Sequence, residues 1–199
     1  KGPLNICITI FGELPNDLAL RRDAAQVGDD IWISGDIGDA RLALAGYWKE
    51  QVLSEDDHQR AAIRMHRPTP RIALGQALLG TAHAALDISD GLLGDLGHIL
   101  ERSKVGARLD IDQLPAGSVL AARDCELRRA FTLAGGDDYE LCFTAPESNR
   151  DAVIAAGKQA QTTVTRVGQI EAEPGLRLFD HNGQAYQHQL RGFDHFRSE

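Results

Sequence analysis

Cysteine is scarce in this chain, and the few thiols are widely separated. The 199 residues include Cys7, Cys125 and Cys142, and no two of them form a C-x-x-C pair. That spacing indicates neither a zinc site nor a framework of disulfides. Unpaired thiols fit a reducing compartment, so we expect a cytoplasmic protein.

Long apolar runs and an excess of positive charge are missing too. No stretch approaches the roughly 20 apolar residues that span a bilayer, and the first residues lack a signal-peptide layout, so neither membrane insertion nor export is expected. Lys and Arg number 21 against 29 Asp and Glu, a net charge of −8, which argues against a nucleic-acid partner. An acidic protein can still bind phosphates through magnesium and helix N-termini.

What the chain does contain is the composition of an ordinary globular protein, with 43% hydrophobic residues. Strands and helices are interspersed without strict alternation, which favours an α+β fold, a mixed β-sheet with packed helices, over a doubly wound parallel sheet. Periodicity predicts strands in 4–12, DIWISG, AALDI, GARLDID, YELCFTAP, TTVTRVGQI, LRLFD and AYQHQL. It predicts helices from Asp39, Ser54, Thr69 and Leu92 onward, and over 116–132 and 148–158.

The first residues have the pattern of the middle of a longer protein. KGPLNICITIFGELP begins without methionine and alternates like a strand from its fourth residue. We therefore expect residues 1–13 to be the last strand of a missing N-terminal domain and residues 14–199 to form a C-terminal α+β domain. Such an orphan strand should be disordered or should pair with the edge of another molecule.

The segment LDISDGLLGDLGHIL crowds Asp87, Ser89 and Asp90 where a strand turns into a helix. One reading is a helix cap, which would account for Ser89 or Asp90. The other is a metal and phosphate site, because two close carboxylates repel unless a cation lies between them. A cap leaves Asp87 unexplained, since its expected place at the end of a buried strand requires a partner.

Two further glycine turns precede or follow apolar strands. LAGGDDYELCF places Asp137, Asp138 and Glu140 after a Gly-Gly turn, which suits either a ligand or a tight turn with solvated acids. SGDIGDA lacks the lysine of a P-loop, and a plain turn capped by Asp39 is the favoured reading.

Arg22 and the aromatic C-terminus each allow two readings. The guanidinium of Arg22 could clamp a triphosphate or remain a solvated surface group. The terminal RGFDHF could dock on the core or lend a ring to a heterocycle.

Taken together and in order, these segments resemble the thiamine-monophosphate kinases. The match rests on KGPLNICITIFGELP, GDDIWISGDIGDARLAL, LDISDGLLGDLGHI, LAGGDDYELCFT and GFDHF, which cover essentially the whole chain. The superfamily also contains aminoimidazole ribonucleotide synthetase and selenophosphate synthetase, whose C-terminal domain fold the chain is expected to share. The resemblance implies ATP-dependent phosphorylation of thiamine monophosphate to thiamine diphosphate with Mg²⁺, by a protein that is a homodimer when full-length.

The resemblance also implies residue roles. Asp87 and Asp90 look like magnesium ligands, Ser89 and Arg22 like ATP contacts, and Asp137 and Phe193 like substrate contacts. Asp137 stands where the family usually has glutamate, and the family's N-terminal domain, with further acidic ligands, is missing here, so we expect this chain alone to be inactive. Another phosphate acceptor within the superfamily, or a non-catalytic assembly role, are the competing hypotheses.

Overall fold

The computed structural model describes residues 2–15 and 18–187. Its core is a six-stranded sheet with the order β2-β4-β1-β5-β3-β6, in which all neighbours are antiparallel except the parallel pair β3 and β6. The strands are β1 (Asp29–Ser34), β2 (Ala84–Ile88), β3 (Gly106–Asp110), β4 (Glu140–Pro146), β5 (Val164–Glu171) and β6 (Gly175–Phe179). The predicted α+β class is confirmed.

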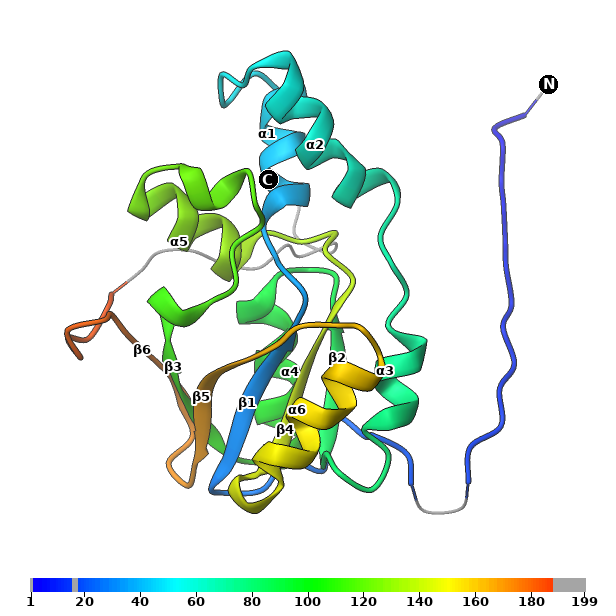
Figure 1. The fold of residues 1–199 in the computed structure, drawn as a ribbon, viewed down its shortest axis with the longest axis vertical. Coiled ribbons are helices and arrows are strands. Elements are labelled where there is room, and N and C mark those ends of the chain that lie inside the picture. Colours follow the sequence, from blue (N-terminus) through cyan, green and yellow to red (C-terminus); the bar gives the residue numbers. More distant parts are fainter. Residues whose placement is uncertain (1, 16–17, 188–199) are drawn as a thin grey trace.

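Helices cover both faces of the sheet (Figure 1). They are α1 (Asp39–Tyr47), α2 (Glu55–His66), α3 (Ile72–Ala77), α4 (Leu92–Ser103), α5 (Cys125–Ala134) and α6 (Arg150–Gln159), with short 3-10 turns η1 (Ile111–Gln113), η2 (Leu120–Ala122) and η3 (Glu147–Asn149). The α4 side of the sheet packs on Ile31 and Ile33 of β1, whereas the α3 and α6 side packs on Trp32. Because both faces are covered, every residue of β1 is buried.

Helices α1 and α2 form a separate layer at one end of the sheet (Figure 1). Their contact is apolar, through Leu42 and Ala43 of α1 and Ala61 and Ala62 of α2. Helix α2 begins as predicted at Ser54, whose hydroxyl accepts a hydrogen bond from the backbone N–H of Asp57 over 3.1 Å.

Several predicted boundaries were wrong. Helix α3 begins at Ile72, not beside Thr69, because Arg71 leaves the helical conformation while its guanidinium binds Glu140. The predicted helix over 116–132 is divided into η2 and α5, since the Asp124 carboxylate caps a new helix through the N–H of Leu127. Only part of AYQHQL lies within the described residues, where Ala185 makes an isolated bridge to Phe179.

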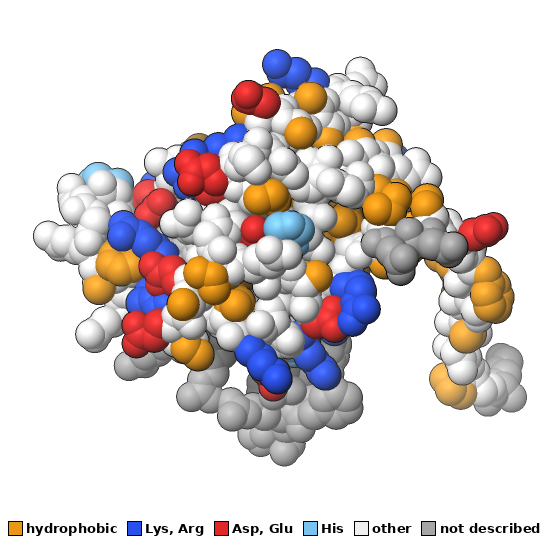
Figure 2. Space-filling view, turned by 90° about the horizontal axis from the view of Figure 1, so that it is seen from below, with side chains coloured by type: hydrophobic (Ala, Val, Ile, Leu, Met, Phe, Trp, Pro, Cys, Tyr) orange, Lys and Arg blue, Asp and Glu red, His pale blue; other side chains and the backbone are white. Residues whose placement is uncertain are grey.

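The N-terminal arm, residues 2–15, runs away from the domain (Figure 1). It forms no strand in the structure, contrary to the strand predicted over 4–12. Leu4, Ile6, Ile8 and Ile10 are all exposed, and Figure 2 shows apolar side chains along the projecting segment. An isolated strand is not stable without a neighbour to pair with, and the described residues place none beside the arm. Its assignment to a preceding domain stays a prediction.

Candidate active site

Three strand ends bring the predicted turns together. Strands β1 and β2 both run antiparallel to β4. The C-terminal ends of β1 and β2 therefore lie at the same end of the sheet as the first residue of β4. The turn after β2 bonds to the turn before β4: the N–H of Asp137 donates to the Ser89 carbonyl and the N–H of Tyr139 to the Ile88 carbonyl, both over 2.9 Å. We call residues 87–91 and 135–139 the acidic turns.

Glycine makes this close approach possible. A Cβ atom on Gly136 would lie 2.3 Å from the Ser89 carbonyl oxygen, and one on Gly91 would lie 2.9 Å from the Ala134 carbonyl oxygen. Gly91 also has a φ of 106°, which L side chains rarely adopt. Each acidic turn therefore carries a glycine where it meets the other.

The carboxylates of Asp87 and Asp90 lie at the surface of the first acidic turn. Asp87 is exposed on β2, which is an edge strand of the sheet, and Asp90 is half-buried. Asp87 is therefore not a buried carboxylate that requires a partner, contrary to the prediction. Exposed carboxylates can still bind a cation, so the metal-ligand prediction stays open.

The helix cap is also organised differently from either predicted version. The N-cap of α4 is Gly91, and no side chain caps it. Instead, the buried Asp95 reaches back and accepts hydrogen bonds from the N–H groups of Ser89 (3.0 Å) and Asp90 (3.1 Å). Burial, followed by the charges of Asp90 and Asp87, raises the pKa of Asp95 to about 6. Through these two hydrogen bonds, Asp95 fixes the backbone of the first acidic turn.

The second acidic turn has an unusual backbone. Asp137 and Tyr139 have φ values of 64° and 52°, and both side chains are exposed. The pKa of the Tyr139 hydroxyl is raised by burial first and then by the charges of Asp137, Asp87 and Asp90. The ring therefore lies within electrostatic reach of all three carboxylates.

Asp138 joins the third glycine turn to this site. Its buried carboxylate accepts the N–H of Gly38 over 2.9 and 3.0 Å, and burial raises its pKa well above the usual range. Asp39 faces away, because its carboxylate accepts the N–H groups of Val119 and Leu120 at η2. The favoured reading of Asp39 as the cap of its own glycine turn was wrong, because the N-cap of α1 is Gly38 and the Asp39 carboxylate accepts hydrogen bonds at η2 instead.

The sequence prediction missed four contributors to this site: Asp95, Tyr139, Arg64 and Arg71. The two arginines bind the fully buried Glu140 from positions 76 and 69 residues away. Separations of that size leave no local pattern to detect. The role of Asp95 could have been predicted. An acidic residue in the first turn of a helix often accepts hydrogen bonds from the backbone N–H groups just before the helix, which here belong to Ser89 and Asp90.

Arg22 is not brought to the acidic turns. Its carbonyl accepts the Ser103 hydroxyl at the end of α4, whereas Ser89 precedes the start of that helix, whose 12 residues span roughly 18 Å. Arg22 instead lines a hollow with Ala85, Leu86 and Arg102. Its predicted contact with ATP stays a prediction, and Phe193 lies outside the described residues.

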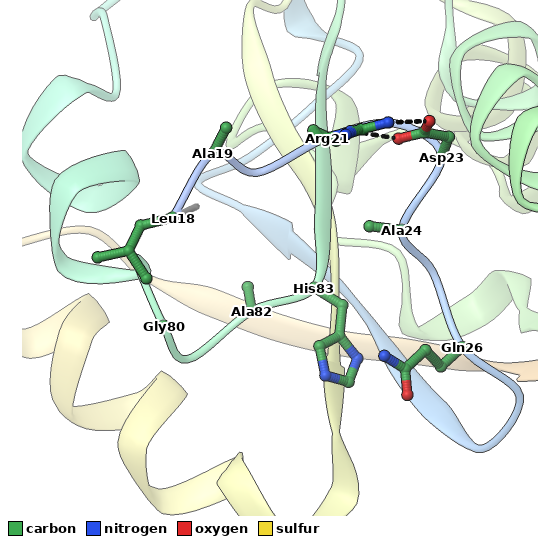
Figure 3. Close-up of a pocket in the computed structure, with 9 residues that line it drawn as sticks. All are labelled: Leu18, Ala19, Arg21, Asp23, Ala24, Gln26, Gly80, Ala82 and His83. Atoms are coloured by element: carbon green, nitrogen blue, oxygen red, sulfur yellow. Dashed lines mark hydrogen bonds and ion pairs between the residues drawn. The ribbon is translucent and has the colours of Figure 1, made fainter. Parts of the chain in front are cut away.

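A neighbouring hollow of about 390 Å³ also lies away from the acidic turns. Figure 3 shows its walls, formed by residues 18–26 and 80–83, with Arg21 paired to Asp23. His83 at its margin binds Asp29 through Nδ1 over 2.9 Å. The hollow is at the start of β2, and the acidic turns are at its end.

The donor chemistry of the acidic turns fits magnesium. Mg²⁺ is usually held by one or two carboxylates together with waters and substrate phosphates, and Asp87 and Asp90 supply such a pair. Within 2–15 and 18–187, no group of three or more His, Cys, Asp or Glu side chains is arranged to hold a metal by itself. Across the same residues, no helix is long and apolar enough to cross a membrane.

Fold and sequence together place the chain in a known class. The family described as AIR synthase related protein, C-terminal domain, matches residues 26–181, and the chain belongs to this family. The predicted resemblance to thiamine-monophosphate kinases is confirmed: the Salmonella typhimurium enzyme is 41% identical over 98% of this chain. The chain spans 61% of that relative's length.

Solved structures agree with this assignment. A thiamine-monophosphate kinase from Stenotrophomonas maltophilia superimposes with a TM-score of 0.78 at 42% identity, over 87% of this chain and 56% of that one. A structure of AaThiL complexed with AMPPCP and TMP gives a TM-score of 0.71 at 29% identity, over 88% and 53% of the two chains.

Proposed function

We propose that this chain is the C-terminal part of a thiamine-monophosphate kinase, which transfers the γ-phosphate of ATP to thiamine monophosphate to give thiamine diphosphate and ADP. The observation that carries the proposal is the pairing of the acidic turns through Asp137 and Ser89, which gathers three surface carboxylates beside one hydroxyl. The similarity to kinases of this activity over 98% of the chain supports it.

In this proposal, the residues of the acidic turns bind and orient the reactants. Asp87 and Asp90 hold magnesium, which when bound neutralises the charge of the phosphates. Ser89 and Arg22 contact ATP, while Asp137 and Phe193 contact thiamine monophosphate. Phosphoryl transfer needs mainly positioning and charge neutralisation, so none of these residues is assigned as a base.

The finer expectations from the sequence are part of the same proposal. They are that the full-length protein is a cytoplasmic homodimer, and that an N-terminal domain supplies further acidic ligands. We accordingly expect this 199-residue chain to show no kinase activity by itself. Turnover of thiamine monophosphate by the purified chain would contradict that expectation.

The deciding experiment measures ADP release by the full-length protein with thiamine monophosphate, ATP and magnesium. Asp87→Asn and Asp90→Asn should each lower turnover by at least 100-fold, a loss of roughly 3 kcal/mol of transition-state stabilisation. Asp151→Asn, an exposed acid on α6, is the control and should retain full turnover.

Other outcomes would point to the competing hypotheses. Unchanged ATP turnover in both variants would favour an assembly role over any kinase. Calorimetry with thiamine monophosphate and with aminoimidazole precursors would distinguish members of the superfamily. An absence of any effect of thiamine monophosphate on binding or ATP turnover would reject the proposal.

A further inference from the structure

Glu140, the first residue of β4, is fully buried and is held by three side chains. The Ser34 hydroxyl donates to its Oε2 over 2.6 Å. Arg71 donates from Nε over 2.6 Å and from Nη2 over 2.5 Å, a bidentate pair, and Arg64 donates from Nη2 over 2.5 Å. Two guanidinium groups from different elements, α2 and the start of α3, thus converge on one carboxylate.

This cluster contains one more positive charge than its buried carboxylate can neutralise. Burying charge is costly, so a second arginine on an already paired glutamate is more than a structural ion pair requires. Each guanidinium also retains unused donors: among the described residues, no protein acceptor binds Nε or Nη1 of Arg64, or Nη1 of Arg71. Neither side chain is fully buried, because 23% of the Arg64 side chain and 14% of the Arg71 side chain are exposed.

The cluster borders the acidic turns. Glu140 lies opposite Ile88 in the β2–β4 ladder, and Ile88 stands between Asp87 and Ser89 in the chain. Glu140 also directly follows Tyr139 in the chain. Asp36 lies within electrostatic reach of both guanidiniums, and in the described residues it forms no ion pair with either.

Without the two arginines, a phosphate group beside the acidic turns would meet mostly negative charge, which comes from Asp36, Asp87, Asp90 and Asp137. We propose that Arg64 and Arg71, positioned by Glu140, bind the phosphate group of the phosphate-ester acceptor. The inference rests on the proposed function and adds an anionic subsite to it. Arginine suits the task because its planar donors match phosphate oxygens, and because its fixed charge offsets the surrounding carboxylates.

The test compares Arg64→Gln with Arg60→Gln in the full-length protein. Both changes remove one arginine from α2, but Arg60 is half exposed and only contacts Asp56 and Asp57 loosely, at 3.6 Å. We expect Arg64→Gln to raise the KM for thiamine monophosphate at least 10-fold with the KM for ATP changed less than 2-fold. Arg60→Gln should leave both within 2-fold.

Arg64→Lys separates binding from folding. It keeps the positive charge and an ammonium donor group but loses the planar guanidinium, so it should restore part of the loss in KM, whereas a purely structural role predicts no selective effect on the acceptor. Equal KM values for Arg64→Gln and Arg60→Gln, or an equal rise in the KM for both substrates, would overturn the inference.

A second measurement distinguishes failure of this inference from failure of the proposed function. Calorimetric titration with inorganic phosphate should give binding to the wild type and Arg60→Gln, and at least 10-fold weaker binding to Arg64→Gln. That result supports the subsite even if the wild type does not turn over thiamine monophosphate. Normal turnover with unchanged phosphate binding in Arg64→Gln rejects the subsite and leaves the kinase assignment intact.

Discussion

The backbone N–H of Asp137 donates to the Ser89 carbonyl over 2.9 Å, and this bond joins two acidic turns from distant parts of the chain. The contact depends on Gly136, because any side chain there would overlap the Ser89 carbonyl. Since Asp87, Asp90 and Asp137 lie on the joined turns, the arrangement of the proposed site is decided by backbone contacts as much as by its carboxylates.

Gly136→Ala should therefore separate the acidic turns. Its Cβ would lie 2.3 Å from a backbone oxygen that cannot move freely, and such overpacking typically costs about 1–3 kcal/mol of the free energy of unfolding. Urea denaturation measures the change. Gly97→Ala is the control, because its Cβ meets nothing within 4 Å inside helix α4, and it should stabilise the fold by up to about 1 kcal/mol.

Asp95 should tolerate asparagine and not alanine. Both backbone N–H groups bind the same oxygen, Oδ2, so a correctly oriented amide oxygen can replace it while a charge near Asp90 is removed. Asp95→Ala leaves two N–H donors without their acceptor, at a cost of about 1–3 kcal/mol of unfolding free energy. Thermal denaturation of the two variants at neutral pH makes the comparison, and equal destabilisation would contradict this account.

The ion pair of Asp112 with Arg129 should make stability depend on acid pH. Arg129 donates from Nε (2.9 Å) and Nη2 (2.7 Å), which holds the pKa of Asp112 well below its usual range. A lowered folded-state pKa gives stability that is complete above the unfolded value near 4 and is lost as pH falls further.

Asp112→Asn should accordingly lower the free energy of unfolding by about 1–3 kcal/mol at pH 7, and the difference from wild type should shrink between roughly pH 5 and 2. Urea denaturation across that range measures it. Asp56→Asn, whose partner Arg60 lies 3.6 Å away at the surface, should change stability by less than about 0.5 kcal/mol at any of these pH values.

Local patterns in the sequence predicted most elements because each signal lies within a few residues. Ser54 capping α2 and the apolar face of α4 are examples. The errors arose where tertiary contacts decide: Arg71 lies before the first residue of α3 and binds Glu140, and Asp87 is exposed on an edge strand. Strand order and long-range ion pairs leave no signal within a few residues of the sequence, so the approach of Arg64 and Arg71 to Glu140 could not be predicted.

The N-terminal arm should contribute little to the stability of the domain. Its apolar residues from Leu4 to Ile10 are exposed, so deleting residues 1–13 should change the melting temperature by less than about 2 °C. If the arm pairs with the edge of another molecule, which is one of the two outcomes expected for an orphan strand, the deletion should also reduce self-association in analytical ultracentrifugation. A large drop in melting temperature would show that the arm packs on its own domain.

Arg22 and Arg21 are adjacent, but only Arg22 should affect nucleotide binding. Both arginines line the hollow beside Leu86, on the free edge of the strand that leads to Ser89, but Arg21 is paired with Asp23 over 2.5 Å, whereas Arg22 forms no ion pair within the described residues. We expect Arg22→Gln in the full-length protein to raise the KM for ATP about 10-fold, equivalent to roughly 1.4 kcal/mol, with little change in the KM for thiamine monophosphate. Arg21→Gln should change either KM by less than 2-fold. Similar effects of the two substitutions would mean that the hollow acts only through its general charge, and that Arg22 does not touch the nucleotide.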